Sequence, residues 1–216
     1  MVAKLRLVWQ NQILQSVLKP LIFAALLFNV WWLDFSLLAV AIYFIGNFLI
    51  YIYPLLNSIT FISSFIILLI FSLAAVSLTT SHFWYLLLVI FVLSTLYYLV
   101  LGLKNLYLTD KDRWYYFLNL SLFYLTFLLF FVETEKYFLF KIIVVFLANF
   151  FLWKEVLKFN INQALHQRTF FALIISLLIS ELVWVISWLS ISFIFAANLT
   201  FLAIYLVESL LIKGRN

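Results

Sequence analysis

Long apolar runs alternate with short polar breaks along the whole chain. The longest run covers residues 169–212 and is interrupted only by the residues WLSIS. A membrane-spanning helix needs about 20 predominantly apolar residues, so a run of this length predicts two helices joined by a tight hairpin. The same rule predicts eight spans in the chain, near 15–33, 35–56, 58–77, 82–103, 114–132, 136–153, 169–189 and 191–212.

The composition agrees with this pattern. Of the 216 residues, 68% are hydrophobic and 10% are charged, whereas about half of a soluble domain is apolar and about a quarter is charged. This composition has too few charged and polar residues to form a surface that faces water. We therefore expect an all-α, polytopic integral membrane protein, in which residues 1–216 form a single transmembrane domain.

The distribution of basic residues predicts the orientation of the spans. With both termini in the cytoplasm, Lys136 and Lys141 are the only two of the 13 Lys and Arg residues on the outer side. This matches the excess of basic residues that cytoplasmic loops carry. Seven spans would place Lys213 and Arg215 outside, so the count favours eight spans and cytoplasmic termini. We expect a multi-pass protein of the plasma membrane.

Small side chains form a stripe on each of the last two spans. Such stripes let helix backbones approach closely in lipid. We therefore expect these two spans to pack against each other. The stripes consist of Thr169, Ala172, Ser176, Ser180 and Ser187 in the first and of Ser192, Ala196, Thr200 and Ala203 in the second.

Glu181 lies inside an otherwise apolar run, about 12 Å from the outer end of its predicted helix. An unpaired charge there costs about 2.5–3.5 kcal/mol on insertion scales, so the carboxyl group needs a proton or a polar partner. Asn198 lies at about the same depth as Glu181, and the long Lys141 side chain can reach that depth from a position nearer the outer end of its span. We therefore predict a buried polar cluster of Glu181, Lys141 and Asn198. Two roles remain open for Glu181, a proton or cation site and a structural contact that fixes helix packing.

Three asparagines, Asn47, Asn119 and Asn149, fall near mid-membrane depth in three different spans. They could line a polar pathway. The alternative is that they form interhelical hydrogen bonds, worth about 0.6 kcal/mol each.

Basic residues of the inner segments are expected to contact anionic lipid headgroups. Asp110 and Asp112 could instead hold a metal that binds a lipid diphosphate, although the interleaved basic residues favour a solvated loop. The residues predicted to contact headgroups are Lys104, Lys111, Arg113, Lys154, Lys158 and Arg168.

Several kinds of chemistry lack the residues that they need. The chain has no cysteine, which excludes disulfides and thiolate metal sites. Its two histidines, His82 and His166, fall on opposite sides of the membrane, so they cannot share a metal or a haem. No phosphate loop, serine elbow or zinc motif is present. We expect no cofactor and no metal, and catalysis is not favoured.

The sequence favours a non-catalytic membrane-embedded subunit or scaffold that packs against protein or lipid partners. Membrane lipids and other membrane-protein subunits are the expected partners, and nucleic acid is not. The alternative is a small transporter or ion- or proton-conducting protein with Glu181 as its coupling site. A lipid-modifying enzyme that uses residues 104–113 is the third hypothesis.

Overall fold

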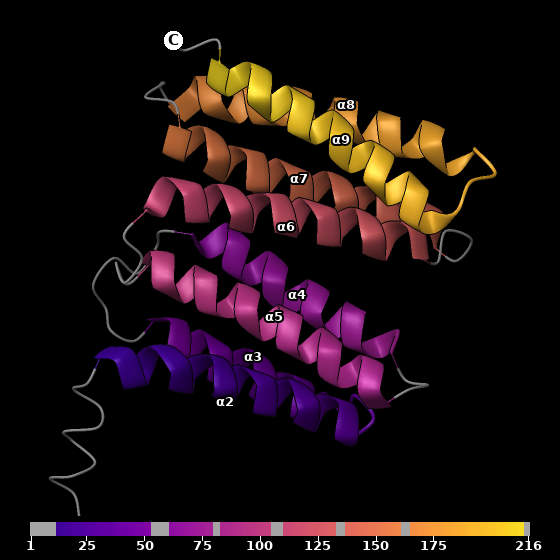
Figure 1. The fold of residues 1–216 in the computed structure, drawn as a ribbon. Helices are drawn as coiled ribbons and strands as arrows, with labels where there is room; N and C mark the ends of the chain where they lie inside the picture. Colours follow the sequence, from indigo (N-terminus) through magenta and orange to yellow (C-terminus); the bar gives the residue numbers. More distant parts are fainter. Residues whose placement is uncertain are drawn as a thin grey trace, which may run out of the picture. The chain divides into compact units, whose positions relative to one another are not determined.

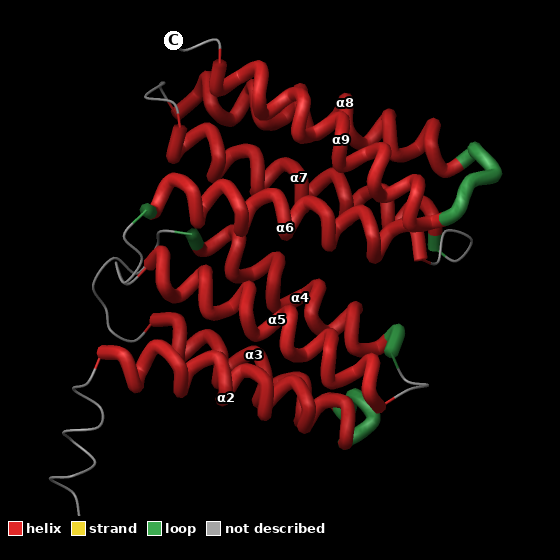
Figure 2. The backbone as a smooth tube through the Cα atoms, in the orientation of Figure 1, coloured by secondary structure: helices red, strands yellow, loops and turns green. Residues whose placement is uncertain are grey.

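The computed structural model describes residues 12–52, 61–79, 83–104, 110–132, 137–160 and 165–213. Within these ranges every regular element is an α-helix (Figure 2). Each of the eight predicted segments overlaps one helix. The helices are α2 (Gln12–Trp32), α3 (Leu37–Ile52), α4 (Ile62–Ser77), α5 (Phe83–Lys104), α6 (Lys111–Val132), α7 (Phe138–Asn160), α8 (Leu165–Ser187) and α9 (Phe193–Lys213).

Three of these helices are long and apolar enough to cross a membrane, namely Phe83–Lys104 in α5, Lys111–Val132 in α6 and His166–Ser187 in α8. Large apolar side chains are also exposed, as in Leu37 at 90% and Trp84 at 80%. Soluble monomers rarely expose extensive apolar surface, so lipid is the solvent that suits these helices. Eight spans, cytoplasmic termini and the plasma membrane stay predictions.

The residues WLSIS do separate two helices. α8 ends at Ser187 and α9 begins at Phe193. Within the connection, the backbone N–H of Trp188 donates to the carbonyl of Val185 at 3.2 Å, and that of Ile191 donates to Leu189 at 2.8 Å. The first of these bonds satisfies a carbonyl that the end of α8 leaves open, and the second lies within the connection itself.

The chain divides into two compact units, residues 1–118 and 119–216. The helix α6 begins in the first unit and continues in the second. Below, the two parts are called unit 1 and unit 2. The single membrane domain expected from the sequence stays a prediction.

In unit 1, α2 packs against α3, α4 and α5, and α4 packs against α5. Figure 1 shows α2 beside α3 and α4 beside α5. Aromatic rings fill the space between the helices. The rings of Phe23 and Tyr97 stack with centroids 4.4 Å apart, and those of Tyr51 and Phe65 stack at 4.1 Å. Offset stacks of this kind stabilise a core beyond the area that they bury.

In unit 2, α8 packs most closely against α7 and less extensively against α9. The small residues Ala172, Ser176 and Ser180 of α8 are buried, as are Ala196 and Thr200 of α9. The predicted packing between the last two helices is therefore confirmed. The closer contact of α8 with α7 was not expected from the stripes, although small side chains allow both approaches.

Candidate functional site

A buried carboxyl group lies in unit 2. Glu208 of α9 is only 1% exposed, and Asn119 of α6 is fully buried. Glu208 follows Thr200 and Ile204 at four-residue spacing, and all three belong to the buried face of α9. Because residues four apart share one face of a helix, the sequence directs this carboxyl group into the core.

The polar atoms of this pair are only partly satisfied. Asn119 lies close enough to Glu208 to interact with its carboxyl group. Neither amide atom of Asn119 nor Oε2 of Glu208 has a hydrogen-bond partner in the part of the chain that the structure describes. Buried polar groups without partners are costly, so these atoms are suited to a proton, a water molecule or a cation.

Two further buried residues with an unpartnered polar atom lie on α7. Asn149 donates through Nδ2 to the Val145 carbonyl at 2.8 Å, while its Oδ1 has no partner among the described residues. The indole Nε1 of Trp153 likewise has none, and its ring contacts Phe123 at 5.5 Å. Glu208, Asn119, Asn149 and Trp153 share this property, and we refer to the four together as the Glu208 centre; the interaction shown within the set is that of Glu208 with Asn119.

The Glu208 centre lies toward one end of unit 2, where α6 and α8 begin and α7 and α9 end. From the 1.5 Å rise per residue, its members lie about 7–17 Å along their helices from that end. Charged side chains near the same end include Lys158, which is exposed, and Lys154, Glu155 and Arg168, which are half-buried. The Glu208 centre and these charged side chains therefore lie toward the same end of unit 2.

Unit 1 holds a different buried group. Lys104, the last residue of α5, is 2% exposed, and Lys19 of α2 is 7% exposed. The Lys104 ammonium donates to the backbone carbonyl of Tyr51 and lies 4.1 Å from the centroid of the Tyr51 ring. Tyr51 stands at the end of α3, where backbone carbonyls lack helical partners and favour a cation.

The two lysines are close enough for their charges to interact. All three carboxyl groups of unit 1, those of Asp34, Asp110 and Asp112, are exposed. Among the residues of unit 1 that the structure describes, the buried charged side chains are those of Lys19 and Lys104. We call Lys19, Tyr51 and Lys104 the Lys104 centre.

Deeper in unit 1, a second set of polar groups is largely paired. The Ser72 hydroxyl donates to the Leu69 carbonyl at 2.7 Å, so the Tyr43 hydroxyl, at 2.6 Å, acts as the donor to Ser72. Asn47 donates through Nδ2 to the Tyr43 carbonyl at 2.8 Å, while its Oδ1 has no partner among the described residues. The Tyr97 hydroxyl likewise has no partner in the described chain.

The predicted cluster of Glu181, Lys141 and Asn198 stays a prediction. Glu181 and Asn198 are exposed on α8 and α9, and Lys141 is half-buried on α7. Across the residues that the structure describes, no hydrogen bond or ion pair joins Glu181 to either of the others. Both Glu181 and Asn198 face the surroundings of the chain.

The three predicted pathway asparagines are all fully buried. Asn47 belongs to unit 1, whereas Asn119 and Asn149 belong to unit 2. Asn47 and Asn149 each bond a carbonyl four residues earlier in their own helix. A polar pathway through them stays a prediction.

The residues expected to contact headgroups differ in exposure. Arg113 and Lys158 are exposed, and Lys111, Lys154 and Arg168 are half-buried, whereas Lys104 is buried in unit 1. Asp110 and Asp112, considered for a metal site, are exposed at the start of α6. Headgroup contact remains a prediction for all six basic residues.

Sequence reasoning missed Glu208 and the pair Lys19 and Lys104. Glu208 lies near the end of the last predicted span, yet it continues the stripe of Ala196 and Thr200 at four-residue spacing. That spacing is the signal that could have found it. The lysine pair joins residues 85 positions apart, and one sequence carries no sign of that contact.

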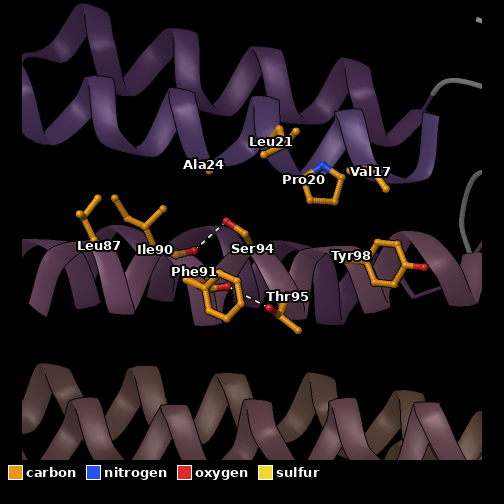
Figure 3. A pocket seen from close by; sticks show the side chains of 10 residues that line it. All are labelled: Val17, Pro20, Leu21, Ala24, Leu87, Ile90, Phe91, Ser94, Thr95 and Tyr98. Atoms are coloured by element: carbon orange, nitrogen blue, oxygen red, sulfur yellow. Dashed lines mark hydrogen bonds between the residues drawn. The ribbon is translucent and has the colours of Figure 1, made fainter. Parts of the chain in front are cut away.

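A surface groove of about 370 Å³ lies between α2 and α5 (Figure 3). Its two hydroxyl groups are directed back to their own helix, Ser94 to the Ile90 carbonyl at 2.7 Å and Thr95 to the Phe91 carbonyl at 3.0 Å. The other side chains that line it are apolar except for the hydroxyl of Tyr98. The groove therefore offers a hydrocarbon surface with almost no polar recognition.

Comparison with known proteins adds no relative. No family model, curated protein or solved structure matches the chain.

Proposed function

We propose that this protein is a membrane-embedded subunit or scaffold that packs against a partner membrane protein through the exposed face of α8. The observation that supports this proposal is the position of Glu181. Its side chain is exposed between Leu178, at 58%, and Val185, at 59%. We call Leu177, Leu178, Glu181, Trp184 and Val185 the Glu181 face.

A carboxyl group on a lipid-facing surface is costly. Near the middle of a membrane helix the cost is about 2.5–3.5 kcal/mol on insertion scales. A partner helix that supplies a lysine, an arginine or a neutral hydrogen-bond donor would offset it. The neighbouring helix α9 exposes Asn198 among apolar residues, including Phe195 and Leu202. One polar group on each of two adjacent helices favours a specific protein partner over bulk lipid.

The test is site-specific photocrosslinking in native membranes. A photoreactive residue at Trp184, on the Glu181 face, should give a discrete crosslinked product. The same residue at Phe91 of α5, which is 72% exposed, is the matched control and should give only lipid adducts. Glu181→Leu should remove the product at Trp184, and Glu181→Gln should retain part of it, because the amide keeps hydrogen-bonding capacity.

The outcomes separate the alternatives. A product of twice the chain mass identifies a second copy as the partner, and another mass identifies a different protein. Lipid adducts alone at Trp184, or a crosslink that is unchanged in Glu181→Leu, would overturn the proposal.

A second candidate function is a small transporter or ion- or proton-conducting protein. The buried Glu208 centre favours it, since ionisable groups within membrane helices often mark ion or proton pathways. In this reading Glu208, rather than Glu181, is the coupling site. Purified chain in liposomes should then conduct protons or cations, Glu181→Gln should keep the flux, and Glu208→Gln should abolish it. Absence of flux in the unmodified chain would exclude this function.

A further inference from the structure

We propose that the Glu181 face packs against a second copy of this chain, with Glu181 of each copy hydrogen-bonded to Asn198 of the other. This inference rests on the proposed function and names the partner that the Glu181 face meets. Because each contact is made twice, such a dimer is closed by a twofold axis. Three properties of α8 and α9 support it.

The first property is the exposure of both polar side chains. Glu181 stands nine residues after buried Ala172, so at 3.6 residues per turn it lies on the opposite side of α8. Asn198 of α9 is exposed as well, although α8 and α9 pack against each other. The contact between the two helices of one chain therefore covers neither group, and a surface from outside the chain can reach both.

The second property is depth. α8 ends at Ser187 and α9 begins at Phe193, so the two helices are joined at one end of unit 2 (Figure 1). From the 1.5 Å rise per residue, Glu181 lies about 9 Å and Asn198 about 8 Å from that end. Two copies inserted in the same orientation are related by a twofold axis along the membrane normal, and rotation about it leaves depth unchanged. A reciprocal contact requires this equality of depth.

The third property is the register of the apolar residues around the two polar groups. Exposed apolar residues lie three positions before and four positions after each of them, namely Leu178 and Val185 on α8 and Phe195 and Leu202 on α9, each between 55% and 59% exposed. Leu178 and Leu202 each lie nine residues from the joined end, and the other two each lie two residues from it. The apolar positions of α8 in one copy therefore come level with those of α9 in the other when the polar groups meet.

The chemistry of the pair suits a contact within a membrane. An asparagine amide both donates and accepts hydrogen bonds, so it can satisfy the Glu181 carboxyl group in its ionised or its protonated form. A hydrogen bond between membrane helices strengthens association by about threefold, and two reciprocal bonds by about sevenfold. A contact of this strength should separate when the chain is diluted in detergent micelles.

The experiment is disulfide crosslinking between two differently tagged copies in native membranes at low expression. The chain has no cysteine, so it supplies only the thiols that are introduced. One copy carries Val185→Cys and the other carries Phe195→Cys, which excludes a disulfide within one chain. The matched control carries Phe91→Cys on α5, a position that is 72% exposed, in place of Val185→Cys. Oxidation should give a product with both tags for the first combination and none for the control.

Substitutions at the polar pair test whether the contact is reciprocal. Glu181→Leu in both copies, or Asn198→Leu in both copies, removes both hydrogen bonds and should lower the yield about sevenfold. Glu181→Leu in one copy with Asn198→Leu in the other leaves one bond intact, so the yield should fall only about threefold. Exchanging the two residues in both copies, Glu181→Asn with Asn198→Glu, rebuilds both bonds and should restore the yield.

Two results would overturn the inference. The first is a mixed pair that gives no more product than either variant alone, because the contact would then lie within one chain or with another protein. The second is a Val185→Cys yield no higher than that of the control. If photocrosslinking at Trp184 still gives a partner of another mass, the proposed function stands and only the second copy is excluded. If Trp184 gives lipid adducts alone, the proposed function fails as well.

Discussion

The two units treat buried polar groups in different ways. In unit 1, Lys104 contacts a backbone carbonyl and an aromatic ring, and Tyr43 bonds Ser72, although Oδ1 of Asn47 and the Tyr97 hydroxyl have no partner in the described chain. In unit 2, Glu208 and Asn119 lie together but leave three polar atoms without partners in the described chain. Satisfied groups fix a structure, whereas unsatisfied groups leave a place for an exchangeable proton, water molecule or ion. This difference predicts that the paired polar groups of unit 1 are rigid. It also predicts that the unpaired polar groups of unit 2 exchange a proton, a water molecule or an ion.

The largest expected effect is at Trp153, which is fully buried in the Glu208 centre. Trp153→Ala should lower the free energy of unfolding by about 3–5 kcal/mol, because it leaves a large cavity beside Phe123. Trp188→Ala is the control, since Trp188 is 76% exposed, and it should change the value by less than about 0.5 kcal/mol. Denaturant unfolding in mixed micelles measures both. Equal losses would mean that the Glu208 centre is loosely packed.

The next effect separates the two glutamates of unit 2. A hydrophobic carbodiimide modifies protonated carboxyl groups in lipid. In the purified chain it should modify exposed Glu181 at least about tenfold faster than Glu208, which reacts only when the unit opens. Peptide mass spectrometry against time gives both rates.

The same labelling in native membranes sharpens the result. The proposed partner on the Glu181 face should protect Glu181 there and leave the rate at Glu208 unchanged. A Glu208 rate equal to that of Glu181 in the purified chain would contradict its burial. It would also remove the contrast between an exposed and an enclosed carboxyl group.

The helices of this protein follow from local sequence, whereas its polar centres do not. An apolar run of about 20 residues predicts a helix wherever it occurs. The residues WLSIS correctly separate the end of α8 at Ser187 from the start of α9 at Phe193. Periodicity shows which residues share a face, but not which face meets a neighbour. Glu181 and Glu208 both lie in apolar runs, yet one is exposed and the other is buried. Tertiary packing decides between them.

The Lys104 centre illustrates the same limit at longer range. Lys104 was expected to reach lipid headgroups because it follows an apolar run. Its ammonium instead finds the end of α3, 53 residues earlier in the chain. A helix end with open carbonyls attracts a lysine wherever the fold brings one near. Which lysine arrives depends on how α2, α3 and α5 pack.

A smaller effect compares two tyrosines of unit 1. Tyr43→Phe should lower the free energy of unfolding by about 1 kcal/mol, because it removes the hydrogen bond to Ser72. Tyr97→Phe removes a buried hydroxyl that has no partner in the described chain, so it should be neutral or raise stability by up to about 1 kcal/mol. Chemical unfolding of both variants gives the comparison. A loss at Tyr97 as large as that at Tyr43 would show that its hydroxyl is satisfied in the membrane.

The smallest effect is expected for Gly46→Ala, which tests how closely α2 and α3 approach in unit 1. A Cβ atom added at Gly46 would lie 3.0 Å from Cδ1 of Leu26. Alanine gains up to about 1 kcal/mol in helix propensity over glycine, and the flexible end of the leucine side chain can shift at a small cost. The net change for Gly46→Ala should therefore stay within about 0.5 kcal/mol, measured by denaturant unfolding. Gly46→Leu adds a branched side chain at the same contact and should destabilise by about 1–3 kcal/mol through overpacking. If both variants were neutral, the two helices would not be held at this distance, and the rigid packing attributed to unit 1 would lose its support.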